Sequence, residues 1–331
     1  MDALKHYPIS LTEVFRARAV VGQYLRPTPL VRYEGLSRAI GAEVYVKHEN
    51  HNLTGSFKIR GGLNLLSHLQ RLGLPGVITF STGNHGLSVA TAARQFGLQA
   101  VVVVPEKNNP TKNRAIRETG AELVESGRTF EESARTVERL QAERGFYYAH
   151  PADEPLLING VGTEFLEVAE ALPDVDAVIV PLGAGSEAAA AITVLRALRT
   201  GIEVIAVQAE RSPAAHRSWQ AKELCADRNE TFAGGVATGQ AYAVPFQIYR
   251  DGLDRFVLLT EDEIYDAIAL AMHYTHNLAE GAGAAPILAA FALREQLAGK
   301  RVVLQMSGGN ASPDEVAVAV ARQAFRAGWQ G

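Results

Sequence analysis

Short apolar, β-branched runs alternate with amphipathic stretches through most of the chain. Residues 101–104 are all valine, which is typical of a strand that helices cover on both faces. Similar patterns predict strands at residues 44–47, 77–80, 100–104, 122–124, 146–149, 177–180, 204–207, 256–259 and 302–305. Strands that alternate with helices through short connections favour an α/β fold with mainly parallel sheets.

Local signals refine this picture. Thr260-Glu261-Asp262-Glu263 has the spacing of a capping box and predicts a helix that runs from there to about His276. The chain shows no repeat, no low-complexity segment and no Pro/Gly/Ser-rich linker. Two domains, if present, are therefore expected to be entwined rather than arranged in series.

Composition narrows the class of protein. The 331 residues are 47% hydrophobic and 21% charged, with a formal net charge of -4. Scattered basic residues give no reason to expect nucleic acid or a membrane surface as a partner. No stretch approaches the roughly 18 apolar residues of a membrane span, and the first ten residues lack a signal-peptide core. We expect a cytoplasmic protein, with its single cysteine, Cys225, as an unreactive helix residue.

Lys58 is the first candidate for chemistry. It follows the strand at 44–47 and would lie in the first turn of a helix, which Thr54 or Ser56 can cap. The positive end of a helix dipole disfavours an ammonium group and so favours the neutral amine that attacks a carbonyl. From position alone, a solvated surface lysine remains the alternative.

The second candidate is Ser81-Thr82-Gly83-Asn84-His85-Gly86, between the strand at 77–80 and a helix expected from about Leu87 to Phe96. Small and hydroxyl-bearing residues at a helix N-terminus form a site for anions, such as the carboxylate of a small substrate. The alternative is an ordinary capped turn with a structural histidine.

The third candidate is Gly183-Ala184-Gly185-Ser186-Glu187, between the strand at 177–180 and an alanine-rich helix. Glycines let the backbone approach a phosphate group closely. The same residues satisfy G-x-G-x-x-A, a weak dinucleotide-binding fingerprint, with Glu203 or Glu210 as the ribose-binding acid. An NAD-dependent oxidoreductase therefore remains an alternative. A fourth loop, Ser307-Gly308-Gly309-Asn310, places a hydroxyl after the strand at 302–305.

Together these four motifs resemble, in order and spacing, those of the fold-type II pyridoxal-phosphate enzymes, specifically the threonine/serine dehydratase and serine racemase group. The resemblance runs from Arg26-Pro27-Thr28-Pro29-Leu30 to Asn310. It implies two entwined, open, twisted, mainly parallel sheets flanked by helices, as in the tryptophan synthase β subunit. It also implies a large cofactor domain (1–75 and 152–331), a small domain (76–151) and a homodimer.

The resemblance assigns roles to the matching positions. Lys58 should form the Schiff base with pyridoxal 5′-phosphate, with Phe57 packed near the cofactor. Asn84 should bind the pyridoxal 3′-oxygen, Ser307 should face the pyridine nitrogen, and Glu280 should lie near the ring. The cofactor phosphate should be held by Gly183, Ala184, Gly185 and Ser186. The substrate carboxylate should be lined by Ser81, Thr82, Gly83 and His85.

This set favours elimination chemistry. A neutral serine hydroxyl cannot stabilise a pyridinium as a carboxylate would, so the ring is a milder electron sink and prompt loss of a β-leaving group is favoured. We therefore expect an ammonia-lyase (dehydratase) that converts a β-hydroxy amino acid to a 2-keto acid and ammonia, with Lys58 as general base. Threonine and serine are the default substrates, and phenylserine or hydroxyaspartate are bulkier options.

Departures from the family pattern leave alternatives open. Serine racemase carries a serine at the position of Thr82, so racemisation is a secondary reading in which Thr82 acts as the acid/base. Ser186 and Glu187 interrupt the usual run of glycines. Gln208 replaces an acid of the family's divalent-cation site, and a second acid near Ala214 is missing, so we expect no metal at that position. β-Replacement chemistry and a catalytically silent binding protein are further options.

Overall fold

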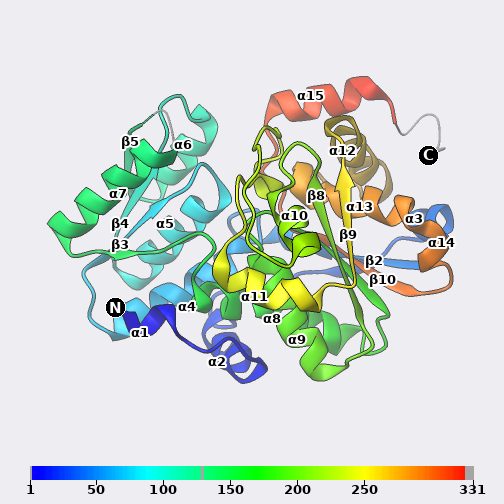
Figure 1. The fold of residues 1–331 in the computed structure, drawn as a ribbon, viewed down its shortest axis with the longest axis horizontal. Helices are drawn as coiled ribbons and strands as arrows, with labels where there is room; N and C mark the ends of the chain where they lie inside the picture. The colour runs from blue at the N-terminus through cyan, green and yellow to red at the C-terminus, as the bar shows by residue number, and fades with distance from the viewer. Residues whose placement is uncertain (1, 128–129, 325–331) are drawn as a thin grey trace. The chain divides into compact units, whose positions relative to one another are not determined.

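The computed structural model describes residues 2–127 and 130–324. The chain divides into two compact units, which are described separately below (Figure 1). Unit 1 comprises Met1–Arg26 and Lys58–Thr163, and unit 2 comprises Pro27–Phe57 and Glu164–Gly331. The chain passes from unit 2 into unit 1 at the peptide bond between Phe57 and Lys58.

Unit 1 contains a four-stranded parallel sheet with the strand order β5-β4-β3-β6. Its strands are β3 (Gly76–Phe80), β4 (Gln99–Val104), β5 (Glu122–Glu125) and β6 (Tyr147–Tyr148). Its helices are α1 (Asp2–Lys5), α2 (Leu11–Val21), α4 (Lys58–Arg71), α5 (Asn84–Phe96), α6 (Pro110–Glu118), α7 (Phe130–Arg144) and the first part of α8 (Pro155–Ala171).

Helices cover both faces of this sheet because β4 is apolar on both. Val101 and Val103 pack with side chains of α7 on one face. Val102 and Val104 pack with side chains of α5 and α6 on the other. All four valines are buried, which confirms the prediction from the unbroken valine run.

Unit 2 contains a six-stranded sheet with the order β1-β2-β10-β7-β8-β9, parallel except for β1. Its strands are β1 (Leu30–Arg32), β2 (Glu43–His48), β7 (Ala177–Pro181), β8 (Glu203–Ala209), β9 (Arg255–Leu259) and β10 (Arg301–Met306). Its helical segments are α3 (Glu34–Ile40), η1 (Glu49–His51), α9 (Ser186–Leu198), α10 (Ala214–Ala221), η2 (Gly234–Val236), α11 (Ala243–Gly252), α12 (Glu261–Thr275), α13 (Gly281–Ala292), α14 (Arg294–Leu297) and α15 (Pro313–Arg322).

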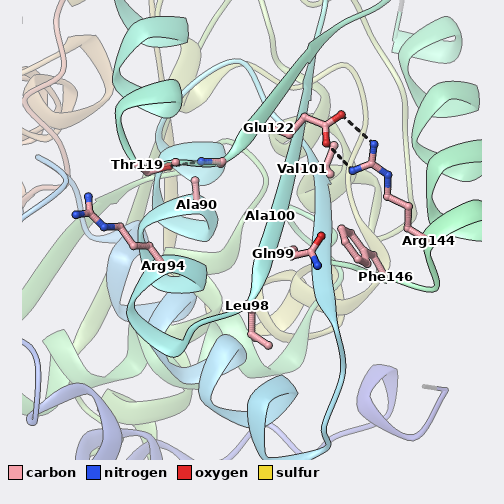
Figure 2. A pocket seen from close by; sticks show the side chains of 12 residues that line it. Ala90, Arg94, Leu98, Gln99, Ala100, Val101, Thr119, Glu122, Arg144 and Phe146 are labelled. Carbon is pink, nitrogen blue, oxygen red and sulfur yellow. Dashed lines mark hydrogen bonds and ion pairs between the residues drawn. The ribbon is translucent and has the colours of Figure 1, made fainter.

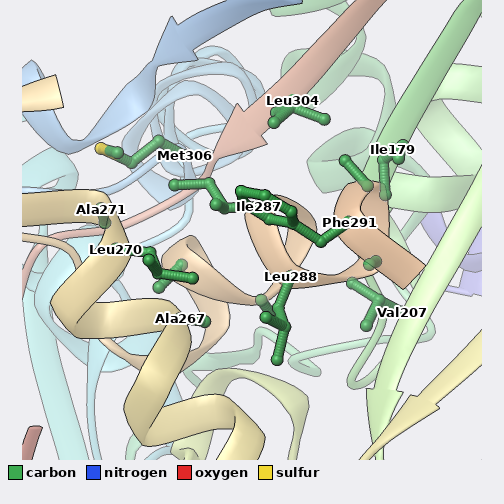
Figure 3. Close-up of a cluster of buried hydrophobic side chains, with 14 of the residues drawn as sticks. Ile179, Val207, Ala267, Leu270, Ala271, Ile287, Leu288, Phe291, Leu304 and Met306 are labelled. Atoms are coloured by element: carbon green, nitrogen blue, oxygen red, sulfur yellow. The ribbon is translucent and has the colours of Figure 1, made fainter. Parts of the chain in front are cut away.

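The largest part of the unit 2 core lies around α13, which Figure 3 shows between the sheet and α12. Ile287, Leu288 and Phe291 of α13 meet strand side chains such as Leu304 on one side and Leu270 of α12 on the other. Every residue from Gly281 to Phe291 is buried. A helix that is apolar all round is buried all round, and it fixes where its own N-terminus lies.

The strand predictions are confirmed at all nine positions, and the fold class is the expected one. The sequence did not predict β1, a three-residue antiparallel edge strand with little burial and hence no apolar pattern. The capping box before α12 is present. Helix α5 begins at Asn84, three residues earlier than expected, so Asn84, His85 and Gly86 belong to its first turn.

The contact-based division differs from the expected domain ranges of 1–75 with 152–331 and 76–151. Helices α2 and α4 belong to unit 1 because Val21, Leu63 and Leu66 share a core with Val89 of α5. The expected ranges also include residues 1, 128–129 and 325–331, which lie outside the described residues. Within the described ranges, no helix has both the length and the apolar character that crossing a membrane requires.

Candidate active site

The lysine segment begins in unit 2 with backbone that is fixed to the loop after β10. The Phe57 N–H donates to the Ser307 carbonyl oxygen at 3.0 Å, and Ser56 forms a bridge with Gly308. The Gly309 N–H donates in turn to the Gly55 carbonyl at 2.9 Å. Two segments that lie far apart in the sequence are thereby held as a short ladder, and Lys58 is the next residue along the chain.

In unit 1, Lys58 is the first residue of α4, as the sequence predicted. Its carbonyl oxygen accepts a hydrogen bond of 2.6 Å from the Ser88 hydroxyl of α5. The two helices pack very closely here, because a Cβ on Gly62 would lie 2.4 Å from Ser88 Oγ. The side chain of Lys58 is half-buried. The backbone is therefore hydrogen-bonded on both sides of the Phe57–Lys58 peptide bond.

The expected helix cap is not formed. Thr54 Oγ1 and Ser56 Oγ are both buried, and neither has a hydrogen-bond partner among the described residues. The Asn310 amide instead binds the Thr54 carbonyl oxygen at 2.9 Å. The prediction that Thr54 or Ser56 caps α4 is therefore wrong, because this segment is used to pair with the loop at 307–310.

The second motif forms a turn at the carboxyl end of β3. The Gly83 N–H donates to Ser81 Oγ at 3.3 Å, and Gly83 is the N-cap of α5 without a side-chain cap. Thr82, Ser81 and Asn84 all retain some exposure to solvent. An uncapped helix N-terminus presents N–H groups to an anion. Ser81, Thr82 and Gly83 thus lie beside an uncapped helix N-terminus, an arrangement that suits a carboxylate, and Asn84 and His85 follow in the first turn of the helix.

His85 has a structural hydrogen-bonding role in this turn. Its Nε2 lies 3.0 Å from Thr79 Oγ1 and 3.3 Å from the Ala149 carbonyl oxygen, while Thr79 itself donates to that carbonyl. Burial first, and then the nearby charge of Lys58, lowers the pKa of His85 to about 3. The imidazole is therefore neutral, with Nε2 as the donor, and it ties the first turn of α5 to β3 and to the strand end at Ala149.

The third motif, in unit 2, is a glycine turn that leads into α9. A Cβ on Gly183 would lie 2.3 Å from the Gly235 carbonyl oxygen, so no side chain fits there. Gly185 is the N-cap of α9 with a φ of 96°, a conformation that favours glycine. Ser186 and Glu187 follow and are both buried. The turn combines close backbone approach with a helix N-terminus.

Glu280 belongs to the same part of unit 2. Its N–H donates to the Gly308 carbonyl oxygen at 3.1 Å, and it is the N-cap of α13. A Cβ on Gly235 would lie 3.7 Å from Glu280 Oε1. Glu280 thus lies between Gly235, which contacts the glycine turn, and the loop that carries Ser307. The unit 2 motifs at 54–57, 183–186, 280–283 and 307–310 form one connected cluster.

Three features of this cluster and of the unit 1 turn escaped sequence reasoning. A Cβ on Gly235 would lie 2.5 Å from Ala282 Cβ, and a Cβ on Gly283 would lie 2.3 Å from the Gly308 carbonyl oxygen. The Gly-Gly pair at 234–235 and the Gly-Ala-Gly run at 281–283 were the signals for these two glycines. Lys112 lies 3.8 Å, at its Nζ, from the place of a Cβ on Gly83. No sequence pattern linked Lys112 to the turn, since the contact arises only when α6 packs beside α5.

Gln208 and Cys225, two further residues that the sequence singled out, lie outside this cluster of motifs. Gln208 Oε1 accepts the His216 N–H at 3.1 Å, while its Nε2 is buried without a hydrogen-bond partner among the described residues. Across the described ranges, no group of three or more His, Cys, Asp or Glu side chains has the arrangement of a metal site. Cys225 lies after α10 ends at Ala221 and not within a helix, which corrects that expectation.

Figure 2 shows a separate pocket of unit 1, lined by Arg94, Gln99, Phe146 and the paired side chains of Glu122 and Arg144. Gln99 and Glu122 are the first residues of β4 and β5. The pocket therefore lies at the amino ends of the strands, whereas parallel sheets carry ligands at their carboxyl ends. The turn at 81–86 follows β3, so it lies at the carboxyl ends of the strands of the same sheet.

An α/β fold with a lysine at a helix start and a glycine turn at a strand end defines a class of cofactor-binding enzyme. Residues 21–308 match the pyridoxal-phosphate dependent enzyme family, and the chain belongs to this family. It is 39% identical, over 92% of its length and 76% of the relative, to an L-threonine ammonia-lyase of Geobacter sulfurreducens. The expected family and cofactor are thereby confirmed.

Solved structures agree with this assignment. The fold matches a threonine deaminase of the organism abbreviated T.th. with a TM-score of 0.87 and 32% identity, covering 92% of this chain and 99% of that one. It matches a serine racemase from Dictyostelium discoideum with the same TM-score and 29% identity, covering 92% and 99%. The oxidoreductase alternative is not supported by these comparisons. Glu203, one of its two proposed ribose-binding acids, lies at the amino end of β8, where it pairs with Lys300.

The residues of this chain fit pyridoxal 5′-phosphate. Gly185, with a φ of 96°, leads into the N-terminus of α9, which has no side-chain cap, as a phosphate site requires. A half-buried lysine at a helix start supplies an amine, and the loop after β10 supplies a hydroxyl in Ser307. An amine, a phosphate turn and a hydroxyl are groups that suit the aldehyde, the phosphate and the ring nitrogen of this cofactor.

Proposed function

We propose that this protein is an ammonia-lyase that converts a β-hydroxy amino acid of the threonine or serine type to a 2-keto acid and ammonia. The relatives named as threonine ammonia-lyase and threonine deaminase support this reaction. The observation that carries the proposal is the double anchoring of the lysine segment, by Ser307 at Phe57 and by Ser88 at Lys58. Such anchoring keeps one amine in place for several proton transfers.

In this proposal, Lys58 binds the cofactor covalently through its ε-amino group. The glycine turn holds the phosphate at the N-terminus of α9, through Gly183, Ala184, Gly185 and Ser186. Asn84 binds the 3′-oxygen, and Phe57 and Glu280 pack beside the ring. Ser307 faces the pyridine nitrogen as a neutral partner, and this weakens the ring's capacity to hold negative charge.

Substrate binding falls to the turn after β3. The N–H groups of the first turn of α5, together with the hydroxyls of Ser81 and Thr82, hold the carboxylate, and Gly83 allows its close approach. His85 keeps this turn in place through Thr79 and the Ala149 carbonyl. Burial lowers the pKa of His85 to about 3, which favours the neutral imidazole in this role.

The bound cofactor supplies an electron sink for the charge that remains after Cα loses its proton. Lys58 Nζ, released when the amino group of the substrate takes its place, would take that proton as general base. The β-hydroxyl then leaves as water, and one water later enters to release ammonia and the 2-keto acid. The net conversion is of one hydroxy amino acid to one keto acid and one ammonia, so the step needs no outside oxidant.

A keto-acid release screen tests this function. Purified protein is incubated with threonine, serine, phenylserine and hydroxyaspartate in both configurations, and keto acid and ammonia are measured in parallel. We expect equal amounts of both products from at least one substrate, and none from Lys58→Ala. Chiral analysis of the residual amino acid tests racemisation, in which Thr82 would act. Full cofactor loading without keto acid from any of these substrates would refute the lyase.

The domain ranges, assembly and location remain part of the proposal. The family resemblance supports a large domain of 1–75 and 152–331, a small domain of 76–151 and a homodimer. The sequence supports a cytoplasmic location, since its single cysteine makes an intrachain disulfide impossible. Light scattering of the purified protein should give twice the chain mass of 35.6 kDa, and the mass of one chain would contradict the dimer.

A further inference from the structure

Tyr249 of α11 is a buried side chain that the expected chemistry does not use. It has no solvent exposure, and its hydroxyl has no hydrogen-bond partner in the part of the chain that the structure describes. Buried polar groups are paired in nearly all proteins, so an unpaired tyrosine hydroxyl needs an explanation. A phenylalanine would fill the same space without leaving an unpaired oxygen.

The ring of Tyr249 lies against the glycine turn. A Cβ on Gly185 would lie 3.1 Å from Tyr249 Cε1 and 3.0 Å from Pro245 Cβ. Pro245 and Tyr249 are four residues apart on α11, so they present one helix face to this turn. The hydroxyl oxygen is only two bonds from Cε1, and this holds it within a few ångströms of the N-terminus of α9.

The hydroxyl is a proton donor at any ordinary pH. Burial, and then the nearby Cys225 thiol, raises the pKa of Tyr249 well above its usual value. A neutral hydroxyl with no acceptor, beside a helix N-terminus that favours anions, is suited to a phosphate oxygen.

We propose that the Tyr249 hydroxyl donates a hydrogen bond to the phosphate group of the cofactor bound at the glycine turn. The proposal rests on the proposed position of the phosphate at residues 183–186. It adds a side-chain donor from α11 to a site otherwise built from backbone N–H groups and Ser186. The partner that the hydroxyl lacks is then the ligand itself.

Tyr249→Phe tests this through binding rather than activity. Full-length protein stripped of cofactor is titrated with pyridoxal 5′-phosphate and, separately, with pyridoxal, which lacks the phosphate. We expect Tyr249→Phe to lower the affinity for pyridoxal 5′-phosphate about tenfold and to leave the affinity for pyridoxal unchanged. The phosphorus resonance of the loaded protein should shift in the variant. Tyr265→Phe, which removes a hydroxyl from a stacked ring of α12, serves as the matched control.

Stability of the stripped protein separates this role from a structural one. A hydroxyl that bonds within the fold would, on removal, lower the urea midpoint of the cofactor-free protein. A hydroxyl whose only partner is the phosphate should leave that midpoint unchanged or raised in Tyr249→Phe. Unchanged affinity for both aldehydes, or equal weakening of both, would overturn the inference. Failure of the wild-type protein to bind either aldehyde would instead overturn the proposed function.

Discussion

Gly183→Ala should disrupt the phosphate turn because the added methyl group has no space. Its Cβ would lie 2.3 Å from the Gly235 carbonyl oxygen, whereas ordinary contacts begin at 3.4 Å. The Cβ is fixed to the backbone of the turn and the carbonyl oxygen belongs to the backbone of η2, so neither can rotate away. The turn or η2 therefore has to move by about 1 Å. Overpacking of this kind costs about 1–3 kcal/mol. The same displacement misaligns N–H donors to a charged phosphate, each worth about 1.5–3 kcal/mol.

Loss of one such hydrogen bond corresponds to a decrease of about 10- to 100-fold in cofactor affinity, since about 1.4 kcal/mol is a factor of ten. Absorbance titration of the stripped protein with pyridoxal 5′-phosphate measures the affinity, and urea unfolding measures the cost to the fold. Gly201→Ala is the matched control, because Gly201 is exposed and a Cβ there meets nothing within 4 Å. Wild-type affinity in Gly183→Ala would refute the assignment of the turn.

Three further changes test other parts of the structure. Ser88→Ala removes the donor to the Lys58 carbonyl and should cost about 1 kcal/mol in urea unfolding and lower turnover severalfold; unchanged turnover would show that this anchor is dispensable. Burial raises the pKa of Glu154 to about 7. The protonated carboxyl therefore stabilises the fold fully below pH 4.5, and up to about 3 kcal/mol of unfolding free energy is lost as the pH rises through 7. The stability of the wild type relative to Glu154→Gln should therefore fall between pH 5 and 8, and parallel pH profiles would contradict this. Thr260→Ala breaks the capping box of α12 and should cost about 1 kcal/mol without any change in cofactor affinity; weaker cofactor binding would link α12 to the site.

Much of the fold could be predicted from the sequence because strands that are buried on both faces give unbroken apolar runs. The four valines of β4 and the strands of unit 2 gave this signal. The edge strand β1 gave none, since it is short and partly exposed. The start of α5 was misplaced because Asn84, His85 and Gly86 have neither the apolar period nor the capping residue that marks a helix start.

The candidate site was predictable where backbone requirements select particular residues. Gly183 and Gly185 are needed by a close approach and by a positive φ, and such positions are visible as glycines. Lys58 was expected at a helix start and is found there. The contributions of Tyr249 and Lys112 were not predictable, because each reaches its turn only through the packing of a helix from elsewhere in its own unit.

Covalent attachment of the cofactor to Lys58 can be measured directly. Protein saturated with pyridoxal 5′-phosphate is reduced with borohydride and digested, and its peptides are sequenced by mass spectrometry. We expect the phosphopyridoxyl group on the ε-nitrogen of Lys58, in the peptide that also contains Phe57. A saturated protein that carries the group on another lysine, or on none, would contradict this expectation.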